Sequence, residues 1–238
     1  MKKGQKILLV LVSVLFVAVA GGYAFLQTQS YAAEPRTEQL AEQAAETNHW
    51  LYFSAENTDK PMIIFYPGAL VDTASYSGWA EKLAAAGYPV YLMKMPLDLA
   101  VLSPDRASIV LKEHPDKRYV IGGHSLGGVM ASRFAKEHTR QLAGAFFLAS
   151  YPDEKGSLKG IEIPVLSLTA TNDQVLNHRA YQKAKEELPA TTEYKTIHGG
   201  NHAGFGDYGA QTGDGESTIS NQTQQVAKAL QDWLEHLK

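Results

Sequence analysis

The sequence of 238 residues predicts one main domain of the α/β class, with a mostly parallel sheet covered by helices on both faces. Short apolar runs rich in β-branched and aromatic residues recur along the chain and are typical of buried strands. Segments with helical spacing separate these runs, which implies crossover connections between parallel strands. The predicted strands are Trp50–Phe53, Met62–Tyr66, Val90–Met93, Tyr119–Ile121, Ala145–Ala149, Val165–Leu168 and Thr192–Ile197.

Helical spacing is clearest in three segments, each of which places apolar side chains on one face. The first contains Tyr76, Trp79 and Leu83, and the second contains Tyr181, Ala184 and Leu188. The last segment carries the longest apolar stripe, made of Ile219, Val226, Leu230, Trp233, Leu234 and Leu237. These faces are expected to pack against the sheet.

The N-terminal part of the chain differs in character from the rest. Lys2, Lys3 and Lys6 precede the apolar run Ile7–Leu26, which is long enough to span a bilayer as a helix. Lysines on the N-terminal side favour a cytoplasmic head and a domain outside the cell membrane, in a single-pass arrangement. Alternatively the segment is a signal that is cleaved after Ala20 or Ala32, which would release a secreted protein.

Three regions follow from these patterns. Residues 1–32 are predicted to be a membrane anchor or signal segment, residues 33–48 a polar, alanine-rich linker that leads into a first helix, and residues 49–238 the α/β domain. The net charge is only −3, without a long basic run beyond the first six residues, so nucleic acid is not an expected partner. The absence of cysteine excludes disulfides, thiolate metal sites and a cysteine nucleophile, and no histidine set has metal-ligand spacing. No metal or other cofactor is expected.

The stretch Gly123-His124-Ser125-Leu126-Gly127 fits the pattern G-x-S-x-G. A predicted strand precedes it and a predicted helix, Val129–Lys136, follows it, which is the context that a nucleophile elbow requires. In such a turn the serine hydroxyl lies above the sheet edge, and the flanking glycines leave room for a strained backbone. The alternative interpretation is an ordinary glycine-rich turn that contains a serine.

A serine nucleophile needs a base and an acid, which in this topology follow it in the order Ser, Asp or Glu, His. Asp173 lies just past the predicted strand Val165–Leu168, and His202 lies just past the last predicted strand. Asp153, after the preceding strand, is the alternative acid, and His198 is the alternative base.

An oxyanion hole would require two backbone donors near the serine. The N–H of Leu126 directly follows the candidate nucleophile, and the N–H of Ala69 lies in the loop Pro67-Gly68-Ala69 after an early strand. The alternative for this loop is an ordinary Pro-Gly turn.

Together the motifs IIFYPGALVD, GGHSLGG, TNDQVL and GGNHAGFGDYG resemble those of the α/β-hydrolase family, and in particular a bacterial dienelactone-hydrolase-like subgroup. The resemblance extends from about Trp50 to the C-terminus. It implies an eight-stranded, mostly parallel sheet and a serine-type triad of Ser125, Asp173 and His202. Dienelactone hydrolases proper use a cysteine, which this chain lacks, and Pro67-Gly68 stands where many members carry His-Gly.

The segment SYPDEKGSLKGIEI joins two predicted strands at the place where many such hydrolases insert a cap, and it is too short and polar to form one. We therefore expect an open cleft. The leading functional interpretation is a serine hydrolase, similar to carboxylesterases, that cleaves small-molecule esters through an acyl-enzyme. The alternatives are an acyltransferase that uses the same triad and a non-catalytic, membrane-tethered binding module.

Overall fold

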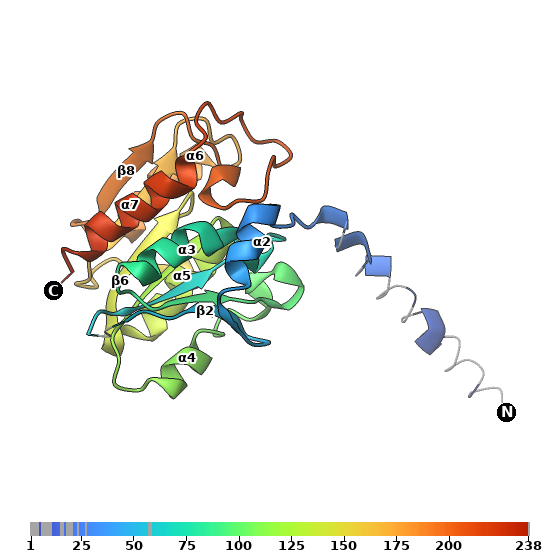
Figure 1. Cartoon of the computed structure of the whole chain (residues 1–238), viewed down its shortest axis with the longest axis horizontal. Coiled ribbons are helices and arrows are strands. Elements are labelled where there is room, and N and C mark those ends of the chain that lie inside the picture. Colours follow the sequence, from blue (N-terminus) through green and yellow to red (C-terminus); the bar gives the residue numbers. More distant parts are fainter. Residues whose placement is uncertain are drawn as a thin grey trace. The chain divides into compact units, whose positions relative to one another are not determined.

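Eight strands form one sheet in the computed structural model, which describes residues 5, 11–14, 17, 21–22, 24–26, 28–56 and 59–237 (Figure 1). Their order across the sheet is β1-β2-β4-β3-β5-β6-β7-β8, and only the β1–β2 and β2–β4 pairs are antiparallel among these described strands. The strands are β1 (Ala45–Glu46), β2 (Trp50–Phe53), β3 (Met62–Tyr66), β4 (Val90–Met93), β5 (Tyr119–His124), β6 (Leu142–Leu148), β7 (Val165–Ala170) and β8 (Glu193–Ile197). The predicted eight-stranded, mostly parallel sheet is thus confirmed.

Helices cover both faces of this sheet, as the alternation of strands and helices predicts. They are α2 (Pro35–Ala41), α3 (Ser77–Ala85), α4 (Ser108–Glu113), α5 (Leu126–Glu137), α6 (His178–Ala184) and α7 (Gln222–Leu234). Helices α3 and α7 contact each other on one face, where Trp79 and Trp233 are fully buried (Figure 1). The opposite face carries α5, whose Phe134 packs into a second apolar cluster.

Strand β3 illustrates how one short sequence serves both faces. Ile63 and Phe65 belong to the apolar cluster beneath α3 and α7, whereas Ile64 and Tyr66 belong to the cluster beneath α5. All four side chains are fully buried. Alternate residues of a strand point to opposite faces, so a strand covered on both sides must be apolar throughout, which explains the continuous run MIIFY.

Residues 33–48, expected to be a linker, are part of the packed domain. They include α2 and β1, and Ala33 and Thr37 are buried. The backbone N–H of Glu34 donates to the carbonyl of Asp207, and the Thr37 hydroxyl donates to the Asp207 carboxylate. Composition suggested a linker because these stabilising partners are about 170 positions away in the sequence.

The chain divides into two units, residues 1–30 and residues 31–238. Much of the apolar run Ile7–Leu26 lies outside the described residues. Within the part that is described, no helix has both the length and the apolar character needed to cross a bilayer.

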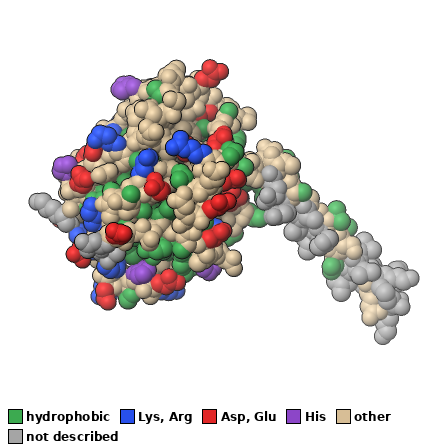
Figure 2. All heavy atoms as spheres, viewed as in Figure 1, with side chains coloured by type: hydrophobic (Ala, Val, Ile, Leu, Met, Phe, Trp, Pro, Cys, Tyr) green, Lys and Arg blue, Asp and Glu red, His purple; other side chains and the backbone are tan. Residues whose placement is uncertain are grey.

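The connection between β6 and β7 contains only the short 3-10 helix Glu154–Gly156. This arrangement agrees with the expectation that the domain has no cap. Over the visible face of the domain, acidic and basic side chains are interspersed (Figure 2).

Candidate active site

Ser125 lies in a sharp turn between β5 and α5, with φ 50° and ψ −125°. A positive φ is strained for a residue with a side chain, and such strain often marks functional positions. A Cβ at Gly123 would come within 2.5 Å of the backbone of Gly127, and one at Gly127 would come within 2.2 Å of the carbonyl oxygens of Tyr66 and Pro67. The two motif glycines are therefore required by close backbone contacts, as the elbow interpretation predicts.

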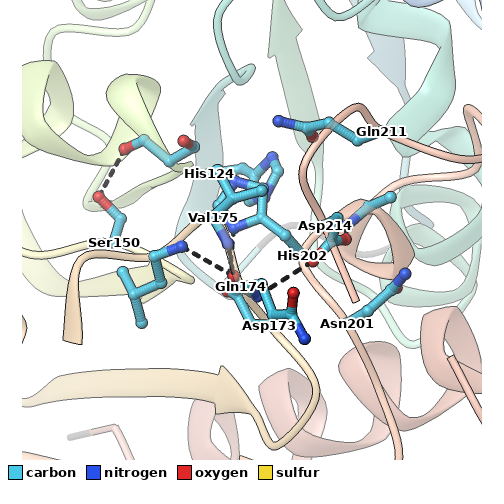
Figure 3. Close-up of polar contacts among 12 residues, drawn as sticks. His124, Ser150, Asp173, Gln174, Val175, Asn201, His202, Gln211 and Asp214 are labelled. Atoms are coloured by element: carbon cyan, nitrogen blue, oxygen red, sulfur yellow. Dashed lines mark hydrogen bonds and ion pairs between the residues drawn. The ribbon is translucent and has the colours of Figure 1, made fainter. Parts of the chain in front are cut away.

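Backbone hydrogen bonds hold the elbow in place. The N–H of Ser125 donates to the carbonyl of Leu148 at 3.1 Å, which ties the turn to the neighbouring strand β6. The carbonyl of Ser125 accepts from the N–H of Gly128 at 3.1 Å and from the hydroxyl of Ser150 at 2.6 Å (Figure 3). These bonds leave the Ser125 side chain half-buried at the carboxyl edge of the sheet. The sequence carries no signal that singles out Ser150, because its role depends on a strand that pairs with β5.

Asp173 and His202 meet at this same edge. Asp173 follows β7, His202 follows β8, and the Nδ1 atom of His202 lies 2.9 Å from Oδ2 of Asp173. Both residues are almost fully buried, at 2% and 1% exposure. The other carboxylate oxygen, Oδ1, accepts the backbone N–H groups of Val175 and Leu176 at 2.9 and 2.8 Å. Because a carboxylate only accepts, Nδ1 carries the imidazole proton and Nε2 is left as an acceptor.

Ser125 and His202 line one cavity of about 220 Å³. The other lining residues are Leu126, Val129, Ala149, Ser150, Tyr151, Val175, Leu176 and Asn177. The side chains of Ser125 and His202 are not hydrogen-bonded to each other in the described part of the chain, which is common for a nucleophile and base without substrate. Its lining combines apolar side chains with the polar residues Ser125, Ser150, Tyr151, Asn177 and His202.

The two alternative residues lie elsewhere. Asp153 forms a bidentate ion pair with Arg133 and accepts the N–H of Gly156. The hydrogen bond from Arg133 holds the pKa of the Asp153 carboxyl below its usual value. His198 is exposed to solvent. The structure therefore pairs Asp173 with His202, the combination that the sequence favoured.

The loop Pro67-Gly68-Ala69 follows β3 and lies against the elbow, as the contact between Gly127 and the Pro67 carbonyl indicates. Among the described residues, neither the N–H of Ala69 nor that of Leu126 has a hydrogen-bond acceptor. The N–H of Gly68, in contrast, donates to the Tyr76 hydroxyl at 2.9 Å. Both N–H groups are thus available as donors; Leu126 lines the cavity that contains Ser125, whereas Ala69 is not among its lining residues.

Tyr76 and His124 form a buried link beside this site that the sequence did not reveal. The Tyr76 hydroxyl accepts from the N–H of Gly68 and shares a hydrogen bond of 2.9 Å with Nδ1 of His124. The ring of His124 lies 4.5 Å from the ring of His202. Burial, and secondly the neighbouring His202, lower the pKa of His124 well below its usual value, although the backbone of His202 acts in the opposite direction. His124 is therefore neutral at pH 7, which avoids a second positive charge beside the candidate base.

In the part of the chain that the structure describes, no three His, Asp or Glu side chains converge in a way that could hold a metal ion. The candidate site is made of a serine, an imidazole, a carboxylate and backbone N–H groups. This set of groups can carry out nucleophilic attack, proton transfer and stabilisation of an oxyanion.

Residues 62–226 match the family model described as the alpha/beta hydrolase family. The chain is an alpha/beta hydrolase. No curated protein matches this hydrolase. Three solved structures illustrate its similarity to other proteins at the level of the fold.

One is a dienelactone hydrolase from Anabaena variabilis, 17% identical, with a TM-score of 0.61 and coverage of 79% of this chain and 91% of that one. Another is a monoacylglycerol lipase from Paleococcus ferrophilus, 14% identical, with a TM-score of 0.60 and coverage of 79% and 98%. A thermophilic esterase from Thermogutta terrifontis is 13% identical, with a TM-score of 0.55 and coverage of 79% and 88%.

Proposed function

We propose that this alpha/beta hydrolase is a serine esterase that cleaves short carboxylic esters through an acyl-enzyme. The observation that carries the proposal is the buried hydrogen bond between Asp173 and His202, beside a cavity that the strained Ser125 also lines. A serine hydroxyl is a weak nucleophile until a base takes its proton, and this arrangement supplies a base with an oriented acceptor nitrogen.

In the proposed reaction, Ser125 attacks the ester carbonyl as Nε2 of His202 takes the hydroxyl proton. Asp173 keeps the imidazole in the required tautomer and stabilises the imidazolium that forms. The free N–H groups of Ala69 and Leu126 stabilise the negative charge on the carbonyl oxygen. His202 then protonates the leaving alkoxide, and the acyl group stays on Ser125. A water molecule, activated by His202 in the same way, releases the carboxylic acid.

The dimensions of the cavity support small substrates. Its volume of about 220 Å³ lies below the range of roughly 300–1,000 Å³ that is usual for sites holding drug-sized molecules. The connection between β6 and β7 adds no cap that could enclose a long acyl chain. Both features favour short or water-soluble esters over long-chain triglycerides.

The names of the structural neighbours agree with this chemistry, because they include an esterase and a lipase. Their low identity restricts the comparison to the fold. A binding module without catalysis is the less favoured function, since binding alone does not require a nucleophile, a base and an acid together.

Labelling with a fluorophosphonate probe tests the proposal, because the probe reacts only with an activated serine. The wild-type protein should be labelled and should hydrolyse p-nitrophenyl acetate. Ser125→Ala should lose both properties and remain folded, whereas Ser54→Ala, at an exposed serine without side-chain contacts among the described residues, should keep both. Equal labelling of the Ser125→Ala protein would exclude Ser125 as the nucleophile.

We further propose that the N-terminal segment keeps this enzyme on the cell membrane with its catalytic domain outside. The three lysines before the apolar run Ile7–Leu26 support this orientation. Fractionation of cells that express the full chain should place the protein in the membrane fraction. Protein in the medium with a mature N-terminus at Gly21 or Ala33 would instead indicate a cleaved signal.

A further inference from the structure

One carboxylate, that of Asp214, joins the two loops that carry the candidate acid and base (Figure 3). Its Oδ2 accepts the backbone N–H of Ala203 at 2.9 Å, and Ala203 directly follows His202. Its Oδ1 accepts the backbone N–H of Gln174 at 3.2 Å, and Gln174 directly follows Asp173. Oδ1 also accepts the N–H of Gly215 at 2.8 Å, which fixes the carboxylate within its own loop.

This bridge adds to two backbone hydrogen bonds that join the same loops nearer the sheet, from the N–H of Thr171 to the carbonyl of Ile197 and from the N–H of Asn172 to the carbonyl of Gly200. The pairing of β7 with β8 ends at Ala170 and Ile197, whereas Asp173 and His202 lie beyond those positions. The 2.9 Å contact between them therefore depends on how the two loops are held. The loop that contains Asp214 contacts both through further bonds, because the side-chain amides of Asn201 and Asn172 donate to the carbonyls of Gly215 and Glu216, respectively.

The chemistry of the bridge favours a carboxylate. Two oxygens that only accept can serve N–H donors on two sides, whereas an amide side chain has one oxygen and would direct its NH₂ group at one of the donors. A backbone N–H left facing another donor loses its hydrogen bond and is destabilised. Asn at position 214 could therefore hold one loop in its present position but not both.

We infer that Asp214 is a positioning residue that sets the contact between Asp173 and His202. The inference rests on the proposed function only where it concerns catalysis. Asp214 does not line the cavity that Ser125 and His202 share, so it should act through the two loops and not through the substrate. Its loss should lower kcat and leave KM nearly unchanged.

The test compares Asp214→Asn with Glu216→Gln, which removes the same charge two residues away at an exposed side chain. With p-nitrophenyl acetate, Asp214→Asn should lower kcat by about 10- to 100-fold, because small displacements of catalytic groups are costly. KM should stay within about twofold, and Glu216→Gln should keep both parameters close to wild type. If Asp214→Asn loses no more kcat than Glu216→Gln, the inference is wrong.

A second readout does not depend on activity. The Nδ1 proton of His202, shared with Asp173, should give a far-downfield proton NMR signal that is absent from Asp173→Asn, which identifies it. In Asp214→Asn the signal should shift or broaden, whereas a residue with only a structural role would leave it unchanged. If the signal of Asp214→Asn is unchanged, the inference is overturned, whether or not the protein has esterase activity. If the wild type is inactive but the signal is altered in Asp214→Asn, only the proposed function is contradicted.

Folding can be separated from positioning. Circular dichroism and thermal unfolding report the folded fraction of each variant, and kcat is expressed per folded molecule. If Asp214→Asn does not fold, Asp214→Ser takes its place, since a hydroxyl offers at most one side of the bridge and should lower kcat about tenfold. Wild-type kcat per folded molecule in that variant would refute the inference.

Discussion

Replacing Asp173 by asparagine tests the proposed mechanism most directly, because the structure defines what the new side chain would do. The Asp173 oxygen Oδ1 accepts the N–H groups of Val175 and Leu176, and an amide oxygen can keep both bonds. The amide NH₂ then occupies the position of Oδ2 and faces Nδ1 of His202. Since an NH₂ group only donates, the imidazole must move its proton to Nε2, where it can no longer accept the proton of Ser125.

The wrong tautomer should lower kcat by about 10⁴-fold. At 1.36 kcal/mol for each factor of ten, this loss corresponds to a rise of about 5 kcal/mol in the activation barrier. Stability should change far less, because only the charge-assisted bond to His202 is lost, with a cost of about 2 kcal/mol in the free energy of unfolding. The variant should therefore be folded and nearly inactive.

The matched control is Asp153→Asn. Asp153 pairs with Arg133 at the surface, where both side chains are 34% exposed, so its charge should contribute about 0–1 kcal/mol to stability and nothing to turnover. Initial rates with p-nitrophenyl acetate and urea unfolding curves measure both effects. The reasoning is refuted if Asp173→Asn keeps more than about a tenth of wild-type kcat, or if Asp153→Asn loses as much as Asp173→Asn does.

Three further predictions concern the cleft, the elbow and pH. Rates on p-nitrophenyl esters from acetate to palmitate should be highest for short chains, and a maximum at long chains, or a sharp rise above the micelle-forming concentration, would contradict the open cleft. Gly127→Ala places a Cβ 2.2 Å from the carbonyl oxygens of Tyr66 and Pro67, so it should lower the free energy of unfolding by more than about 3 kcal/mol. Gly160 has φ 77° and no atom of the described residues near the position of a Cβ, so Gly160→Ala should lower the free energy of unfolding by only about 1–2 kcal/mol. An equal loss of stability in Gly127→Ala and Gly160→Ala would show that the close contact at Gly127 does not matter. The pKa of His124 is lowered in the folded state from its usual value of 6.5. When the pH falls below 6.5, the unfolded state therefore binds a proton at His124 and the folded state does not. As a result, the free energy of unfolding of the wild type falls by up to about 1.4 kcal/mol per pH unit. The stability difference between wild type and His124→Gln should therefore shrink as pH falls from about 7.5 to 5.5, and a constant difference would contradict the buried neutral imidazole.

Features that depend on short stretches of chain could be predicted from the sequence. The run MIIFY is continuous because β3 is buried on both faces, and G-x-S-x-G between a strand and a helix requires the close contacts now seen at Gly123 and Gly127. In each case the tertiary constraint leaves a short pattern in the sequence: a strand covered on both faces is apolar throughout, and the elbow carries glycines at two positions around the serine. The fold class and the place of Ser125 follow from such short patterns.

The choice among equivalent residues needed the tertiary structure. Asp153 and Asp173 both follow a strand; the sequence favoured Asp173, and the ion pair of Asp153 with Arg133 and the contact of Asp173 with His202 now show which carboxylate meets the imidazole. The same limit explains why residues 33–48 were expected to be a linker, since their packing depends on Asp207 far along the chain.

Asp214 shows this limit most clearly. Its two acceptor bonds reach backbone groups 40 and 11 positions away along the chain. Backbone N–H groups are the same at every residue except proline, so no side-chain pattern records which of them a distant carboxylate will bind. By itself the sequence determined the sheet, the elbow and the chemical types of the candidate triad. The tertiary structure decided which acid meets which base and what holds them, because those contacts arise only when separate loops converge at the carboxyl edge of the sheet.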